Sequence, residues 1–225
     1  MTDREFFREV EEAVRQDRYR RLFDRYGVYI IAAAVLIIAG VAGYKAWTYW
    51  RESEAKDAGS EFSQAVTLST GGESAEARKT FERLAAEGPK GYAALSRFQL
   101  AASEAKAGER DKAVATYDAL ATDSRVDNIL QGYAALQAAA LRLETADYAE
   151  MERRLDGLLN NSPWRYSARE LLGLSAYRLN NMGEAEKQFS ALLGDQGTPS
   201  NLRQRADMML ALIAGDPKSL STTAN

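Results

Sequence analysis

The sequence predicts an all-α protein in which one N-terminal transmembrane helix precedes an α-solenoid of about four helix pairs and a C-terminal capping helix. Two observations carry this prediction. An uncharged apolar segment runs from Gly27 to Tyr44. After residue 57, one pattern recurs four times at nearly regular intervals. Ala is abundant, and Val and Ile become sparse after residue 41, which favours packed helices over sheets.

The composition of the 225-residue chain excludes several kinds of chemistry. Because Cys and His are absent, the chain has no thiol nucleophile, no His general base and no His or Cys metal site. The formal net charge is −3 and the charges are mixed, which gives no broad basic surface for nucleic acid. A Ser–Lys pair is the catalytic arrangement that the composition leaves open. We expect a protein that is not an enzyme and uses no cofactor and no metal.

The apolar segment has the length and the flanks of a membrane helix. As a helix it would span about 27 Å, close to the roughly 30 Å hydrocarbon core of a bilayer. Aromatic residues flank it as they do at membrane surfaces, Tyr26 and Tyr29 on one side and Tyr44, Trp47, Tyr49 and Trp50 on the other. We therefore predict a transmembrane anchor with an aromatic belt over residues 27–50. The alternatives are a cleaved signal sequence, whose apolar region is usually shorter, and a buried helix of a soluble protein.

Cations on the two sides of the anchor predict its orientation. Five precede it closely, Arg15, Arg18, Arg20, Arg21 and Arg25, and three follow it, Lys45, Arg51 and Lys56. Since Lys and Arg accumulate on the cytoplasmic side, the N-terminus is expected inside and the large C-terminal domain outside.

Two further features of the N-terminal region are candidate contact sites. Ala32, Ala39 and Gly43 recur on one helical face, which would allow close packing against another membrane helix, although Ala and Gly are common in such helices anyway. Residues 1–26 read as a basic amphipathic cytoplasmic tail, with Thr2 and Glu5 in a capping-box pattern. This tail either lies on the membrane and fixes the topology or binds a cytoplasmic partner.

The repeated pattern has four fixed features. A large residue recurs at Phe81, Tyr117, Leu155 and Phe189. Four residues before it stand Ala77, Ala113, Met151 and Ala185, and three residues after it stand Leu84, Leu120, Leu158 and Leu192. Sixteen residues before it, where the two helices of a pair would cross closely, stand Ala65, Ala101, Ala139 and Gly173. Pro89 and Pro163 follow it by eight residues, whereas Arg125 departs from this rule and the fourth repeat has Pro199 two residues late.

This pattern is typical of tetratricopeptide-type helix–turn–helix repeats. We therefore predict a tetratricopeptide-like domain over residues 51–214, with a capping helix from about Pro199 to Ala214 and a disordered tail over residues 215–225. The first helix of each pair would line a concave surface. Its candidate peptide-binding residues are Leu95, Phe98, Tyr133, Leu136, Leu174 and Tyr177. The alternative is that these residues pack against neighbouring helices.

The chain resembles the tetratricopeptide-repeat-like proteins described as ancillary subunits of the bacterial SecYEG translocon, in particular the alphaproteobacterial branch. The resemblance rests on FREVEEAVRQDRYRRLFDRYG in the tail, the anchor, GYAALSRFQLAA from Gly91 to Ala102, PWRYSARELLGLSAYR from Pro163 to Arg178, and TPSNLRQRADMMLALIAG from Thr198 to Gly215.

The resemblance implies a single-pass protein of the bacterial inner membrane whose repeats face the periplasm. The implied partners are translocon subunits, periplasmic chaperones and newly exported chains. Other interaction proteins share these features, so three alternatives remain. The first is a periplasmic scaffold for envelope or cell-division assembly. The second is a regulator whose tail sequesters a cytoplasmic signalling protein, and the third is a chaperone whose concave face holds client peptides.

Overall fold

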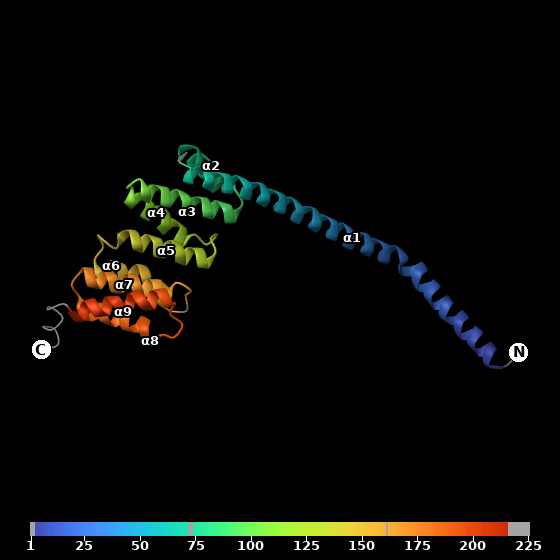
Figure 1. The fold of residues 1–225 in the computed structure, drawn as a ribbon. Helices are drawn as coiled ribbons and strands as arrows, with labels where there is room; N and C mark the ends of the chain where they lie inside the picture. Colours follow the sequence, from blue (N-terminus) through green and yellow to red (C-terminus); the bar gives the residue numbers. More distant parts are fainter. Residues whose placement is uncertain (1–2, 72–73, 161, 216–225) are drawn as a thin grey trace. The chain divides into compact units, whose positions relative to one another are not determined.

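The computed structural model describes residues 3–71, 74–160 and 162–215, with side chains from residue 26 onward. These residues form nine α-helices, which confirms the all-α prediction (Figure 1). The helices are α1 (Asp3–Thr70), α2 (Ser74–Glu87), α3 (Lys90–Lys106), α4 (Arg110–Thr122), α5 (Asn128–Arg142), α6 (Tyr148–Leu159), α7 (Arg165–Arg178), α8 (Met182–Gly194) and α9 (Ser200–Gly215). The chain divides into two compact units, Met1–Lys56 and Asp57–Asn225.

The first unit consists of the N-terminal part of α1. Its apolar segment has a mean hydropathy of 2.2 over an 18-residue window, of which 6% is buried. Large apolar side chains stand free around the helix; Val28 is 79% exposed and Leu36 is 73% exposed. Among the described residues, this is the one helix that is long and apolar enough to cross a membrane. The predicted cap at Thr2 lies outside the described residues, as do the side chains of the basic tail.

The second unit is a stack of helix pairs. The end of α1 pairs with α2 through Ala65, Ala77 and Phe81, and α3 then pairs with α4, α5 with α6, and α7 with α8. Each pair also packs against the next one, and α9 packs against α7 and α8 (Figure 1). We call the four pairs repeats 1 to 4. The helix placed at about Pro199–Ala214 from sequence is α9, shifted by one residue, and the predicted tail after it lies outside the described residues.

Burial of the repeated positions confirms the pattern read from the sequence. The large residues Phe81, Tyr117, Leu155 and Phe189 are at most 5% exposed, and the leucines three residues later are at most 9% exposed. The small residues allow the helices of a pair to touch. A Cβ on Gly173 would lie 2.8 Å from Cζ of Phe189, so the backbone of α7 rests directly against that ring. Glycine at this position is therefore a packing requirement of repeat 4.

Local chemistry explains where the helices turn. The turns inside repeats 2 and 4 contain Gly108 and Asn180, which have positive φ values of 81° and 64°. Gly and Asn adopt this left-handed conformation at low cost, which ends the first helix of the pair. The side chains of Asp127, Asp147 and Asn181 accept backbone N–H bonds at the starts of α5, α6 and α8.

The loop that lacks the expected proline is organised by an ionic cluster instead. Arg125 stands at that position and donates to the carboxylate of Asp123 through its backbone N–H and its guanidinium. Arg97 of α3 binds the same carboxylate at 2.8 Å. These bonds, chiefly those from Arg125, hold the pKa of Asp123 well below its usual value. The loop between α4 and α5 is therefore fixed by charge rather than by a rigid ring.

Candidate partner-binding surface

Three aromatic rings in successive repeats form a continuous row, which we call the aromatic ladder: Phe98 in α3, Tyr133 in α5 and Trp164 immediately before α7. The ring centroids of Phe98 and Tyr133 are 5.5 Å apart, and those of Tyr133 and Trp164 are 5.2 Å apart. All three side chains are half-buried, so each ring packs on its neighbour and keeps part of its area exposed. Such rings offer a large apolar contact surface with little side-chain entropy to lose.

The ladder is anchored to the core beneath it. Phe98 also contacts Tyr117 of α4, with centroids 5.8 Å apart, and Tyr117 is 5% exposed. The indole N–H of Trp164 donates to the backbone oxygen of Ile129 at 2.9 Å, which fixes the ring across the junction between repeats 3 and 4. The ladder is therefore a preformed feature, and a partner would not need to order it on binding.

The six residues predicted for the concave surface do not form one uniform patch. Leu95 is 36% exposed and lies in the same helix as Phe98, one turn before it. Leu174 and Tyr177 are half-buried and pack against the core cluster that α7 shares with α8 and α9. Leu136 is 8% exposed and belongs to the core of repeat 3, so it is not available to a partner. The structure thus brings Phe98 and Tyr133 together and places Leu136 inside.

Sequence reasoning missed the third ring of the ladder and two exposed apolar side chains of the capping helix. Trp164 precedes α7 and falls outside the repeated positions, so no spacing rule identifies it. Met208 and Leu212 of α9 are 52% and 55% exposed. Met208 follows Leu174 by the same number of residues as Phe189 follows Leu155. Continuing the repeat spacing into the capping helix would therefore have found Met208. A capping helix usually presents a polar outer face, which makes these two side chains notable.

Salt bridges and a hydrogen bond link the repeats at positions away from the ladder. Arg154 of α6 reaches Asp118 of α4 at 2.7 Å and also binds Glu150 at 3.0 Å. Glu150 also accepts a hydrogen bond from Arg142 at 3.2 Å. The hydrogen bond from Arg154 and, after it, the one from Arg142 lower the pKa of Glu150. Tyr148 donates a hydrogen bond to Glu184 of α8. Burial is the main cause, and this hydrogen bond the second, that raises the pKa of Tyr148 to about 12. These contacts fix repeats 2, 3 and 4 in register.

The predicted helix-packing face of the apolar segment is on the surface. Ala32, Ala39 and Gly43 are all exposed, and a Cβ on Gly43 would meet nothing within 4 Å. Among the described residues, no cluster of acidic side chains could hold a metal ion.

A comparison with protein-family models matches residues 20–214 to the tetratricopeptide repeat-like domain. The chain belongs to the tetratricopeptide repeat-like domain family. No curated protein and no solved structure matches the chain. The family match covers all four repeats and α9, and it begins before the apolar segment. Repeats of this kind serve as binding surfaces for proteins, which assigns the chain a role in protein–protein interaction.

Proposed function

We propose that this protein is a membrane-anchored scaffold that holds a tetratricopeptide repeat-like binding domain at the membrane surface. The observation that carries the proposal is the continuous band of exposed apolar side chains on α1 in a chain whose repeats bury most of theirs. Residues 28–50 include thirteen of the exposed large hydrophobic side chains, from Val28 to Trp50. In water such an apolar surface would be strongly unfavourable, whereas a bilayer covers it at no cost.

The same band argues against the two alternatives for the apolar segment. A buried helix of a soluble protein would have a face packed against neighbours, yet 6% of this window is buried. A signal sequence would be removed, but the family match begins at residue 20 and so includes the apolar segment with the repeats. This continuity supports an uncleaved anchor, as do the aromatic residues at both of its ends.

For compartment and partner we propose the bacterial inner membrane, with a cytoplasmic N-terminus and periplasmic repeats. The five arginines before the anchor support this orientation. The resemblance to ancillary translocon subunits supports a position beside the SecYEG channel, where the repeats would contact periplasmic chaperones or emerging chains. Tethering raises the local concentration of the domain, so weak contacts through the ladder are sufficient.

The test is a membrane pull-down after crosslinking in cells, read by mass spectrometry. The native chain is compared with a chain whose residues 1–50 are replaced by an unrelated membrane anchor of the same orientation. We expect translocon subunits with the native chain and their loss with the replacement, because the membrane helix and tail would make that contact. Recovery of division, envelope or cytoplasmic signalling proteins in place of translocon subunits contradicts the translocon assignment.

A second comparison tests the binding role of the ladder. Tyr133→Ala removes the middle ring, and the matched control Tyr49→Ala removes a ring of the membrane belt. We expect Tyr133→Ala to reduce recovery of periplasmic partners while translocon subunits stay, since the anchor is intact. Equal recovery of periplasmic partners from both variants would exclude the ladder as the binding surface.

A further inference from the structure

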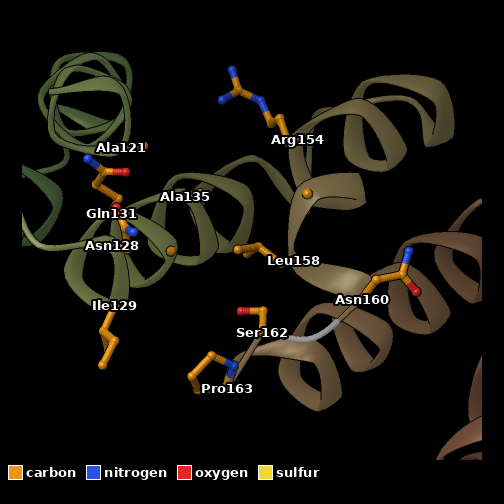
Figure 2. A pocket seen from close by; sticks show the side chains of 12 residues that line it. Ala121, Asn128, Ile129, Gln131, Ala135, Arg154, Leu158, Asn160, Ser162 and Pro163 are labelled. Atoms are coloured by element: carbon orange, nitrogen blue, oxygen red, sulfur yellow. The ribbon is translucent and has the colours of Figure 1, made fainter. Parts of the chain in front are cut away.

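Repeat 3 contains an open cavity of about 500 Å³ beside Trp164 of the aromatic ladder, whose indole N–H binds the lining residue Ile129. It lies between α5 and α6 and extends to Ala121 at the end of α4 (Figure 2). This volume falls within the roughly 300–1,000 Å³ that ligand pockets commonly have.

Comparison with repeats 1 and 2 shows which side chains stand at the corresponding positions there. Counted from the large residue of each repeat, Ala135 and Gly157 occupy the positions that Glu61 and Arg83 hold in repeat 1. In repeat 1 those two side chains meet across the helix pair in an ion pair of 2.7 Å. In repeat 2 the residue that corresponds to Glu61 is Arg97, which bridges to Asp123 at 2.8 Å.

Repeat 3 has no such bridge because both of its residues are small. A Cβ added to Gly157 would meet nothing within 4 Å, so the backbone of α6 faces open space at this point. Glycine is, after proline, the least favourable residue in the interior of a helix. The cavity is thus open because Ala135 and Gly157 are small, although glycine is unfavourable in a helix.

The lining of the cavity is mixed, with an apolar part formed by Ile129, Leu158, Pro163 and small residues. Leu158 points into it from α6, and Ile129 at its edge is 54% exposed (Figure 2). Among the described lining residues, Arg154 is the one charged side chain, and Asp118 and Glu150 already bind it. The remaining polar side chains of the lining are Asn128, Gln131, Asn160 and Ser162.

We propose that this cavity binds one bulky apolar side chain, aromatic or of leucine size, presented by a polypeptide partner. The lining favours an uncharged occupant, because a charged side chain would lose its hydration and find no free opposite charge among the described lining residues. Nε2 of Gln131 already donates to the backbone oxygens of Asp123 and Val126, so the amide of Asn128 is the rim group offered to the backbone of the inserted segment. The choice of a polypeptide as the occupant rests on the proposed scaffold function.

The absence of cysteine from the sequence allows a direct test in the full chain, kept in detergent micelles. The variant Gly157→Cys carries one thiol facing the cavity, and Glu152→Cys carries one on an exposed position of the same helix outside the lining. The probes are blocked nine-residue Gly/Ser peptides with a central Phe, Leu, Ala, Glu or Lys. The rate of thiol modification by a maleimide is measured with each peptide.

We expect the Phe and Leu peptides to slow modification in Gly157→Cys and not in Glu152→Cys. Because burial of a large apolar side chain is favourable, they should act at concentrations at least about tenfold lower than the Ala peptide. The Glu and Lys peptides should give no protection. Equal protection by charged peptides, equal protection of both thiols, or no protection by any peptide would overturn the proposal.

Two controls establish that the protected thiol reports on the cavity. A dye-labelled Phe peptide should bind the Gly157→Ala chain as it binds the native chain, whereas Gly157→Leu should abolish binding by filling the cavity. Undiminished binding to a folded Gly157→Leu chain would place the peptide elsewhere. Protection that grows with the concentration of the chain itself, without peptide, would assign the cavity to a second copy and overturn the proposal. None of these assays depends on the anchor or on a translocon, so failure here is distinct from failure of the proposed function.

Discussion

Replacing Gly173 with alanine places a methyl group where α7 and α8 cross. That Cβ would lie 2.8 Å, 2.9 Å and 3.0 Å from Cζ, Cε1 and Cε2 of Phe189. Carbon atoms in comfortable contact are about 3.5–4.0 Å apart, so the ring must shift by roughly 0.5–0.7 Å. Phe189 is 1% exposed and enclosed by the core, which leaves it little room. Such overpacking lowers the free energy of unfolding by about 1–3 kcal/mol.

The same substitution also has a favourable contribution, which a matched variant measures. Alanine stabilises a helix relative to glycine by up to about 1 kcal/mol. Gly157→Ala makes the identical change in α6, where a Cβ meets nothing within 4 Å. We therefore expect Gly173→Ala to change the free energy of unfolding by between roughly zero and a 2 kcal/mol loss, and Gly157→Ala to raise it by up to about 1 kcal/mol.

The assay is urea unfolding of the full chain in micelles. Trp47 and Trp50 are first replaced by phenylalanine, so that the fluorescence of Trp164 reports on the repeats. The difference between the two glycine variants should be about 1–3 kcal/mol, with Gly173→Ala the less stable. Equal stabilities would show that the helices of repeat 4 do not cross at Gly173 and would refute the register derived from the repeat.

Three further predictions follow from single contacts. Bonds from Arg125 and Arg97 depress the pKa of Asp123, so its ionised carboxylate stabilises the folded state at pH values above the unfolded pKa of about 4. Asp123→Asn should therefore lower Tm at pH 7. The difference in Tm between the native chain and this variant should shrink as the pH falls below about 4. Trp164→Phe removes the donor to the oxygen of Ile129 and should lower the free energy of unfolding in urea, followed by circular dichroism, by about 1 kcal/mol. Leu36→Arg places a charge in the middle of the proposed anchor at a cost of about 2.5–3.5 kcal/mol and should reduce the fraction of chain retained in carbonate-washed membranes.

Each of these three has a contradicting outcome. A Tm difference for Asp123→Asn that persists unchanged at pH 2 would mean that its ionised carboxylate is not the stabilising group. A Trp164→Phe chain as stable as the native one would mean that the indole bond to Ile129 contributes nothing. The control for Leu36→Arg is Ser53→Arg beyond the apolar segment, and equal retention of both variants would argue against a transmembrane position.

The repeat core could be predicted because its spacing is a local property of the chain. Helix pairs of similar length place the same positions in the core each time, so Phe81, Tyr117, Leu155 and Phe189 identify themselves by recurrence. The need for a small residue at Gly173 followed from the same count, and the contact with Phe189 confirms it. Asp123 shows the limit of this reasoning, because nothing in the spacing indicates that charge replaces a proline in its loop.

The candidate surface was harder to predict because exposure depends on how neighbouring repeats pack. Leu136 and Phe98 occupy the same position of successive repeats, yet the first is buried and the second keeps part of its ring exposed. The cavity of repeat 3 depends on two small residues, Ala135 and Gly157, that lie in different helices and face each other only after folding. The extent of α1 was readable in principle, since no proline precedes Pro89 and nothing ends the helix between Trp50 and Asp57.

The proposed function depends most on the topology of the chain, in which one helix crosses the membrane and the repeats lie outside. Because the chain lacks cysteine, Thr2→Cys and Ser221→Cys each introduce a single thiol on one side of the apolar segment. Both variants are treated with a membrane-impermeant maleimide in intact bacterial spheroplasts and again after lysis. We predict that Ser221→Cys reacts in intact spheroplasts and that Thr2→Cys reacts only after lysis. Reaction of both thiols before lysis, or of Thr2→Cys alone, would contradict the account.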